Sequence, residues 1–275
     1  FYVLQNTPLK WNIDANISFN RNRIGGLKAD QFAQKLWSSA DEVFIQRNGC
    51  PIGAIYGYVE DGFYDNLAEV MASPSADIRA KGAGMIGEIK YRNFDDNPDI
   101  TSADRVIIGD TNPDFVYGLT SNFEWKGVTL SFFLQGSQGN DIFNGNLMDM
   151  KMGNVGNITR EAYNTRWTEA NAAQAKWPKA VSGYERNMLI SNRYVEDGSY
   201  LKLKSLNIGY VWKPNFKGIS NVNVYASATN IFTITGYSWF DPEVNAFGSD
   251  ASRRGVDVYS YPSSRTFSLG IKVDF

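Results

Sequence analysis

The last eleven residues, Arg265 to Phe275, read RTFSLGIKVDF and constrain the fold more than any other stretch of the chain. Side chains alternate between the two faces of an extended strand. One face therefore carries only apolar residues, namely Phe267, Leu269, Ile271, Val273 and Phe275. A strand of this length tilted by about 45° climbs about 25 Å, which is the height of the apolar band of a transmembrane barrel. A strand of a soluble sandwich can alternate in the same way, so this segment alone leaves both folds open.

The same alternation recurs along the chain and predicts five more strands. These strands are expected at residues 9–20, 115–125, 128–137, 198–212 and 221–232. Lys126-Gly127 is expected to be a tight turn, and the phase of the alternation slips near Ser205, which predicts a β-bulge. Phe133 lies in the polar phase of its strand and should face the lumen. We therefore predict an all-β fold built as an antiparallel up-and-down transmembrane β-barrel.

The connections between these strands alternate between long and short. In an up-and-down barrel, all short turns then lie at one rim and all long loops at the other, with the turns periplasmic and the loops extracellular. Short helices are expected within the long loops at residues 29–38, near Leu67 to Met71, and near Arg160 to Trp167.

Aromatic residues make up 14% of the chain, which is typical of a barrel with interfacial girdles. Trp11, Trp125 and Trp212 all fall on the apolar face beside short turns, so we predict that they form a membrane girdle against lipid or lipopolysaccharide. The alternative is that they are core residues of a soluble sandwich. The mean hydropathy of −0.34 and the lack of a run of 18 apolar residues exclude a transmembrane helix.

Composition also excludes several kinds of function. The chain has no histidine and one cysteine, Cys50, so histidine triads, histidine zinc sites and internal disulfides are absent. A net charge of −2 argues against a nucleic-acid partner. Asp241 and Glu243 resemble a glycosidase pair only in being two carboxylates, and nothing in the sequence fixes them across a scissile bond. We predict that the chain is not an enzyme.

Six strands are too few to close a barrel, since the smallest outer-membrane barrels have 8. The large transporters of about 22 strands have a plugged lumen, and this chain would supply about a quarter of such a wall. The chain opens on FYVLQNTPLKW without a signal peptide. We therefore expect it to be the C-terminal part of a longer protein.

Four motifs resemble the SusC-like (SusC/RagA family) TonB-dependent transporters of Bacteroidota. They are CPIGAIYGYVEDGFY, GDTNPDFVYGLTSNFEWKGVTLSFFLQGSQGNDIFN, RYVEDGSYLKLKSLNIGY and NVYASATNIFTITGYSWFDPEV, and they follow the family's order from about Pro51 to Phe275. The resemblance implies an outer-membrane barrel whose plug domain and TonB box lie outside this chain. It also implies a SusD-like lipoprotein that lids the barrel, and TonB-driven import of glycans or peptides. The C-terminal strand resembles the signal read by the barrel-assembly machinery.

An acidic segment matches the spacing of an EF-hand calcium loop. Its oxygen-bearing residues at positions 1, 3, 5, 7, 9 and 12 are Asn93, Asp95, Asn97, Asp99, Thr101 and Asp104. Pro98 stands where such loops, and the family's Asp-rich loop, usually have glycine, which should weaken Ca²⁺ binding. The alternative is a solvated loop in which these side chains cap local turns.

A second group of residues is placed to contact cargo or the lid. Tyr237, Trp239 and Phe240 lie in the long loop before the last strand, and Asn192 and Arg193 lie at the top of the strand that starts near residue 198. The alternative is that the aromatics pack against neighbouring loops and that the polar residues form ordinary rim hydrogen bonds.

Three functional hypotheses therefore stand. The first is import of large nutrients with a SusD-like partner. The second is a structural role of the same barrel within a larger outer-membrane assembly, and the third is a soluble all-β binding module.

Overall fold

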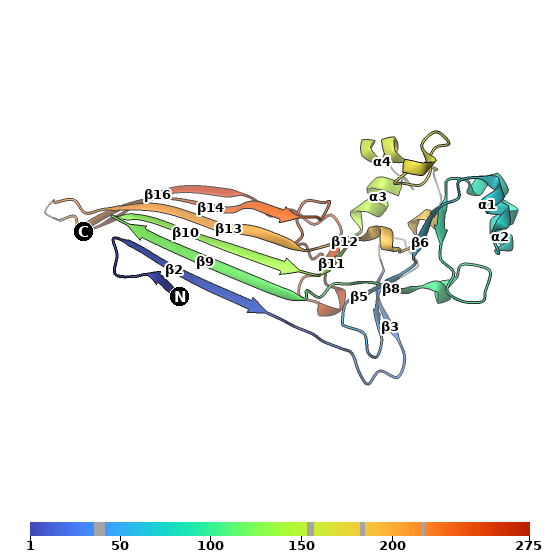
Figure 1. The fold of residues 1–275 in the computed structure, drawn as a ribbon, viewed down its shortest axis with the longest axis horizontal. Helices are drawn as coiled ribbons and strands as arrows, with labels where there is room; N and C mark the ends of the chain where they lie inside the picture. Colours follow the sequence, from blue (N-terminus) through green and yellow to red (C-terminus); the bar gives the residue numbers. More distant parts are fainter. Residues whose placement is uncertain (36–41, 153–156, 182–184, 216–217) are drawn as a thin grey trace.

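The computed structural model describes residues 1–35, 42–152, 157–181, 185–215 and 218–275. Figure 1 shows one long sheet and a compact body at one end of it. The sheet, called the wall here, has seven antiparallel strands in the order β1-β2-β9-β10-β13-β14-β16. Their bounds are β1 Tyr2–Leu4, β2 Leu9–Ser18, β9 Phe115–Trp125, β10 Val128–Gln138, β13 Tyr200–Trp212, β14 Asn221–Thr235 and β16 Thr266–Asp274.

The register of the wall places apolar residues beside apolar residues from strand to strand. One such row crosses six strands through Trp11, Phe123, Leu130, Ile208, Ala226 and Leu269. Large apolar side chains on this face are exposed, with Phe267 72% and Leu269 81% exposed. A continuous apolar face of this kind is stable where lipid rather than water covers it.

The opposite face of the wall is mainly polar. Asn12 lies beside Asn122 and Asn223 beside Lys272, while Phe133 lies between Thr120 and Ser205 and so belongs to the polar face, which is the face predicted to line the lumen. Such alternation of apolar and polar residues is typical of a barrel strand between lipid and lumen.

The predicted turn and bulge are both present. Lys126 and Gly127 have φ values of 48° and 86°, as required in a two-residue hairpin turn between β9 and β10. The register of β13 shifts between Leu203 and Ser205 against both of its neighbours, which confirms the bulge.

The three long connections, residues 19–114, 139–199 and 236–265, gather at one end of the wall (Figure 1). They carry three small sheets, β3-β4-β5-β8, β6-β7 and β12-β11-β15. The strands are β3 Gln31–Lys35, β4 Glu42–Gln46, β5 Ala54–Gly57, β6 Glu60–Phe63, β7 Ile89–Tyr91, β8 Val106–Asp110, β11 Asp141–Asn144, β12 Val195–Asp197 and β15 Val256–Asp257. The helices are α1 Leu67–Ala72, α2 Ala76–Lys81, α3 Asn146–Met152 and α4 Arg160–Thr165, with 3₁₀ turns η1 Gly82–Met85, η2 Ser102–Asp104, η3 Ala172–Gln174, η4 Glu185–Met188, η5 Asn192–Tyr194 and η6 Ala251–Arg253.

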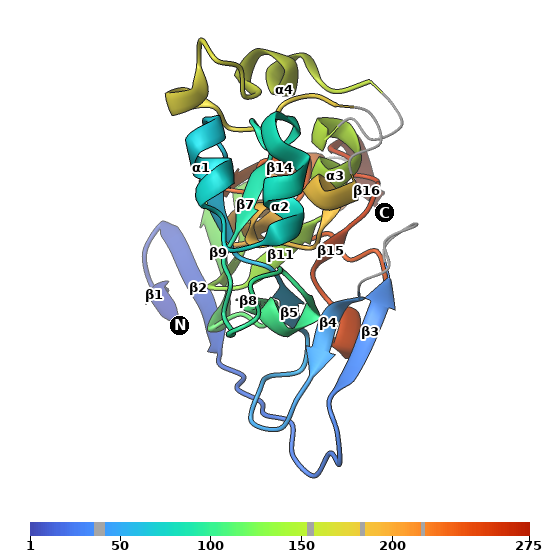
Figure 2. The ribbon, with the colours of Figure 1, turned by 90° about the vertical axis from the view of Figure 1, so that its right-hand side faces the viewer.

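These connections share one hydrophobic core. Ile89 from the first connection, Phe143 and Tyr194 from the second, and Val256 from the third are buried in the same cluster. Figure 2 views this body end-on, with α1, α2 and α4 above the sheet that holds β3 and β4. We call the body the outer cap. Because its core is shared, the three connections are expected to unfold together rather than as independent loops.

One predicted helix is wrong. Residues 31–35 of the expected helix at 29–38 form strand β3, and residues 36–38 lie outside the described part of the chain. Phe32 pairs with Ile45 and Ala33 with Phe44, so pairing with β4 overrides the local helix preference. The other two helices are confirmed as α1 and α4. Within the described ranges, no helix combines the length and apolar character needed to cross a membrane.

Candidate functional site

A pocket of about 510 Å³ opens in the outer cap, and we call it the cap pocket. It is lined by Glu60, Leu147, Glu161, Trp177, Arg193, Glu196, Ser238 and Trp239. All three long connections contribute to it, because Glu60 belongs to the first, Arg193 to the second and Trp239 to the third. The structure therefore brings together two of the residues predicted to contact cargo or the lid.

Arg193 is held rigidly at one side of the cap pocket. Its Nε donates to Glu60 Oε1 at 2.8 Å and its Nη2 lies 2.5 Å from Glu60 Oε2, a two-point ion pair with both side chains largely buried. The guanidinium also lies over the ring of Trp177, 5.2 Å from its centre. Asn192 fixes the same contact from the backbone side, since its Oδ1 accepts the Glu60 N–H at 2.8 Å. Asn192 is thus a positioning residue of the rim.

Glu196 also lines the cap pocket, and neutral groups hold its carboxylate. Its carboxylate accepts 2.8 Å hydrogen bonds from Asn144 Nδ2, from Ser238 Oγ and from the Ser238 N–H. Trp239, which follows Ser238, is partly exposed and packs edge-to-face on Phe240 with ring centres 5.2 Å apart. Phe240 is itself 70% exposed.

Tyr237 is buried and fixes the start of the third connection to Asp257. Its hydroxyl donates to Asp257 Oδ2 at 2.7 Å, and Asp257 is fully buried. Burial first, and then this hydrogen bond, raises the pKa of Tyr237 well above its usual range, so the hydroxyl stays protonated. The burial favours a structural role for Tyr237. Contact of Trp239, Phe240, Asn192 and Arg193 with cargo or a lid stays a prediction.

A four-charge cluster joins the third connection to the polar face of β13. Lys202 Nζ lies 2.8 Å from Asp241 Oδ1 and 2.5 Å from Glu243 Oε2, and Lys204 Nζ lies 2.6 Å from Glu243 Oε2. Burial alone would raise the pKa of both carboxyls, but the hydrogen bonds, led by those from Lys202, outweigh it and lower both pKa values. Two stably ionised carboxylates held by lysines form a structural anchor, and lack the proton that a general acid needs. The sequence signal for this cluster was the pair of lysines, Lys202 and Lys204, in the polar phase of β13.

Most side-chain oxygens of the acidic segment bond locally, whereas Asp99 Oδ1 accepts a hydrogen bond from Ser75 Oγ. Asn93, Asp95 and Asn97 each accept the N–H of the residue two positions on, at 3.0, 2.8 and 3.1 Å, as in Asx turns. Asp104 is fully buried and accepts the N–H groups of Phe94 and Thr101. Among the residues that the structure describes, no group of three or more His, Cys, Asp or Glu is arranged to hold a metal ion. This geometry favours the turn-capping alternative over the Ca²⁺ site, which the sequence had left open beside it.

The three girdle tryptophans lie on the apolar face near the short-turn end of the wall. Trp125 and Trp212 are 50% and 48% exposed. Trp11 stacks on Phe123 and donates its indole N–H to Ser121 Oγ at 2.8 Å, so its polar atom has a partner on an otherwise apolar face. A lipid-facing role stays a prediction that this placement supports.

The predicted assembly signal lies at one edge of the wall. β16 pairs with β14 and is the last strand in the sheet order, while β1 stands at the other edge. Phe267, Leu269 and Ile271 project from β16 with exposures of 72%, 81% and 69%, and Phe275 is 90% exposed. Recognition of this strand by an assembly machinery stays a prediction.

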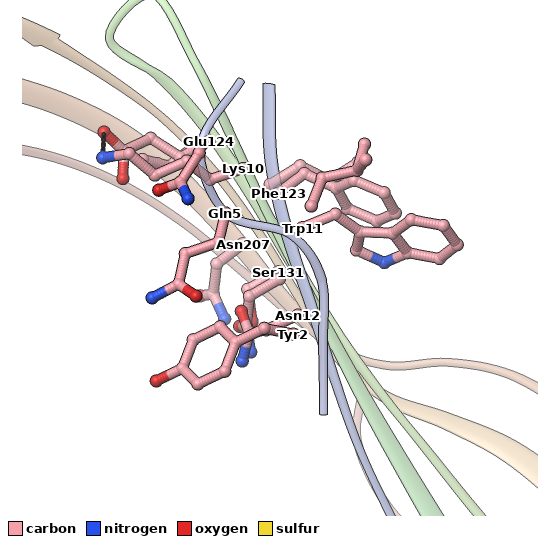
Figure 3. A pocket seen from close by; sticks show the side chains of 14 residues that line it. Tyr2, Gln5, Lys10, Trp11, Asn12, Phe123, Glu124, Ser131 and Asn207 are labelled. Carbon is pink, nitrogen blue, oxygen red and sulfur yellow. Dashed lines mark hydrogen bonds and ion pairs between the residues drawn. The ribbon is translucent and has the colours of Figure 1, made fainter. Parts of the chain in front are cut away.

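A larger hollow of about 690 Å³ lies at the short-turn end, beside β1 and β2. Figure 3 shows Trp11 and Phe123 on one side of the strands, and Tyr2, Gln5 and Asn207 on the other. Its lining therefore belongs to both faces of the wall at the sheet edge. We do not assign it as a binding site, because a neighbouring strand on β1 would reshape it.

Comparisons with known proteins all point to the same group of proteins. TonB-dependent receptor P3 of Formosa agariphila is 33% identical over 99% of this chain, and TonB-dependent receptor SusC of Bacteroides thetaiotaomicron is 26% identical over 96%. The solved RagAB peptide transporter has the same fold, with a TM-score of 0.72 and 20% identity over 100% of this chain. No protein-family model matches the chain.

The chain spans about a quarter of the length of these relatives, 27% of P3, 24% of SusC and 28% of the RagAB chain. Matches along nearly the whole chain, together with the shared fold, identify it as a segment of a SusC-like TonB-dependent receptor, a family of outer-membrane proteins of the Bacteroidota.

Proposed function

We propose that the protein containing this chain imports large nutrients, glycans or peptides, across the outer membrane together with a SusD-like surface lipoprotein. This chain supplies part of the lipid-facing wall and the outer cap above it. The observation that carries the proposal is the joining of these two parts. A wall with a continuous exposed apolar face supports a packed cap at its long-loop end. Support also comes from the relatives named as TonB-dependent receptors.

The proposed mechanism assigns this chain a passive but ordered role. The lipoprotein lid captures cargo, the closed barrel and lid hold it, and TonB pulls on the plug to open a path. The cap pocket faces cargo or the lid during capture. The four-charge cluster keeps the third connection against the wall, so that this part of the lumen lining keeps its shape while the plug moves.

The proposal is tested by deleting the gene that encodes the full-length protein and measuring growth on oligosaccharide or peptide mixtures. We expect a growth defect on at least one mixture, which the wild-type gene restores and a gene without the TonB box does not. Full restoration by the gene without a TonB box would favour the scaffold alternative. Purification from native outer membranes should give a polypeptide of about 100 kDa with a lipoprotein alongside it, since about 22 strands and a plug need that much chain.

A further inference from the structure

The lining of the cap pocket is unbalanced in charge. Three carboxylates, those of Glu60, Glu161 and Glu196, and one guanidinium, that of Arg193, line the pocket, and Arg193 is paired with Glu60. Glu196 therefore adds negative charge that this pair does not balance. Charge of one sign along a concave surface attracts ligand groups of the opposite sign.

Arg193, the one cationic side chain in the described lining of the pocket, is already engaged. Arg193 uses Nε and Nη2 on Glu60, and its Nη1 donates to the Lys176 carbonyl oxygen. A guanidinium that is neutralised at two points in this way has little capacity to bind an anionic ligand. The pocket is therefore poorly suited to sulfated or uronic-acid groups.

The negative charge of Glu196, in contrast, is held by neutral groups among the residues that the structure describes. The donors that orient it, Asn144 and Ser238, are neutral, and no ion pair to Glu196 forms within the described ranges. Three hydrogen bonds also leave room on a carboxylate with about four acceptor positions. Trp239 adds an aromatic ring one residue beyond Ser238, and an aromatic face attracts a cation.

We propose that the cap pocket binds a cationic organic group of the cargo, a primary ammonium or a guanidinium, between Glu196 and Trp239. The proposal rests on the proposed import function and names the chemistry that its outer site selects. A neutral sugar ring could stack on Trp239, but it would leave the charge of Glu196 uncompensated. The same cationic chemistry occurs in lysine- or arginine-bearing peptides and in amino sugars, and the test separates these two sources.

The test uses the purified full-length protein in detergent and isothermal titration calorimetry. The peptide probes are Gly-Gly-Lys-Gly-Gly and Gly-Gly-Gln-Gly-Gly, both capped at each end so that only the central residue differs in charge. The sugar probes are the glucosamine trimer and its fully N-acetylated form. We expect the cationic member of at least one pair to bind about tenfold more tightly than its neutral partner, the size of one charge-assisted contact. The pair that shows the difference identifies the source.

Two variants and a control locate the effect. Glu196→Gln should abolish the preference for the cationic probe, and Trp239→Ala should weaken binding of that probe about fivefold. Glu124→Gln makes the same chemical change on an exposed carboxylate of the wall and should keep the preference. Raising the salt concentration from about 50 to about 500 mM should reduce the preference in the wild-type protein. This measurement does not depend on whether a variant folds.

Equal binding of cationic and neutral probes would overturn the proposal, as would a preference that Glu196→Gln leaves intact. Growth on nutrient mixtures is measured separately. Normal TonB-dependent growth with no cationic preference would overturn this inference alone, whereas normal growth without the TonB box would overturn the import function.

Discussion

Lys202 Nζ lies 2.8 Å from Asp241 Oδ1, and the two side chains are only 2% and 8% exposed. Lys202 belongs to wall strand β13, whereas Asp241 belongs to the connection between β14 and β16. The pair therefore ties the outer cap to the polar face of the wall, and Glu243 and Lys204 extend it to four charges. Buried pairs of this kind are sensitive to the loss of one member, because the remaining charge stays buried without a partner.

Replacing Lys202 with Met should destabilise the third connection by about 3–5 kcal/mol, since Asp241 would lose its buried cation. Thermal unfolding of the detergent-purified full-length protein and protease cleavage within residues 236–265 measure this. Lys10→Met is the matched control, because its ion pair with Glu124 lies on the same wall with side chains 57% and 52% exposed. The control should change stability by less than about 1 kcal/mol. Equal effects of the two variants would show that the buried cluster is not an anchor.

Acid should release this anchor. The pKa values of Asp241 and Glu243 are lowered from the usual 3.8 and 4.5, because the lysine hydrogen bonds outweigh the burial that opposes ionisation. Groups with lowered pKa values stabilise the folded state above their unfolded pKa, and this stability is lost as the pH falls through the folded values. Protease resistance of residues 236–265 should therefore be constant from pH 7 to about 5 and decline below pH 4.5. Asp241→Asn should remove part of this decline, and an unchanged pH profile would contradict the assignment.

The wall could be predicted from the sequence because its signals are local. Residues 115–125 alternate without interruption and end at Lys126-Gly127, so the predicted strand coincides with β9. The predicted segment at 221–232 stops three residues short of the end of β14 at Thr235. Near the end of the predicted segment, Asn230 adopts a φ of 52° at the point where the register with β13 shifts. The alternation that marks the strand is interrupted at this point.

The outer cap could not be predicted in the same way, because remote residues hold its strands. β11 pairs in parallel with β15 through Phe143 and Val256, more than a hundred positions apart, and β15 has only two residues. Glu60 and Arg193 meet across a similar separation. Neither contact leaves a periodic pattern, so the sequence indicated Arg193 and Trp239 as candidates but missed Glu60, Trp177 and Glu196.

Gly57 is expected to be essential for the packing of the cap. A Cβ at this position would lie 2.4 Å from the carbonyl oxygen of Ile190, which accepts the N–H of Tyr58 at 2.7 Å. Gly57→Ala must therefore push apart backbone segments of the first and second connections, and it should destabilise the cap by about 1–3 kcal/mol or prevent its assembly.

Gly236→Ala provides the control for this change, because a Cβ there meets no atom within 4 Å and the backbone needs no left-handed conformation. It should leave thermal unfolding and protease resistance of the full-length protein close to the wild type. If Gly57→Ala is equally neutral, the close approach to Ile190 does not limit the packing of the first two connections.

The acidic segment is expected to depend on Asp104 rather than on a bound ion. Asp104 accepts two backbone N–H groups while fully buried, so Asp104→Ala would leave both without a partner and should destabilise this segment by about 2–3 kcal/mol. Asp96→Ala, an exposed aspartate of the same segment, should have little effect. Thermal unfolding of the wild-type protein should be the same in about 1 mM CaCl₂ and in EDTA. A Ca²⁺ concentration of roughly 1 mM is enough to occupy weak Ca²⁺ sites. A Ca²⁺-dependent rise in the unfolding temperature that Asp95→Ala abolishes would instead establish the ion site.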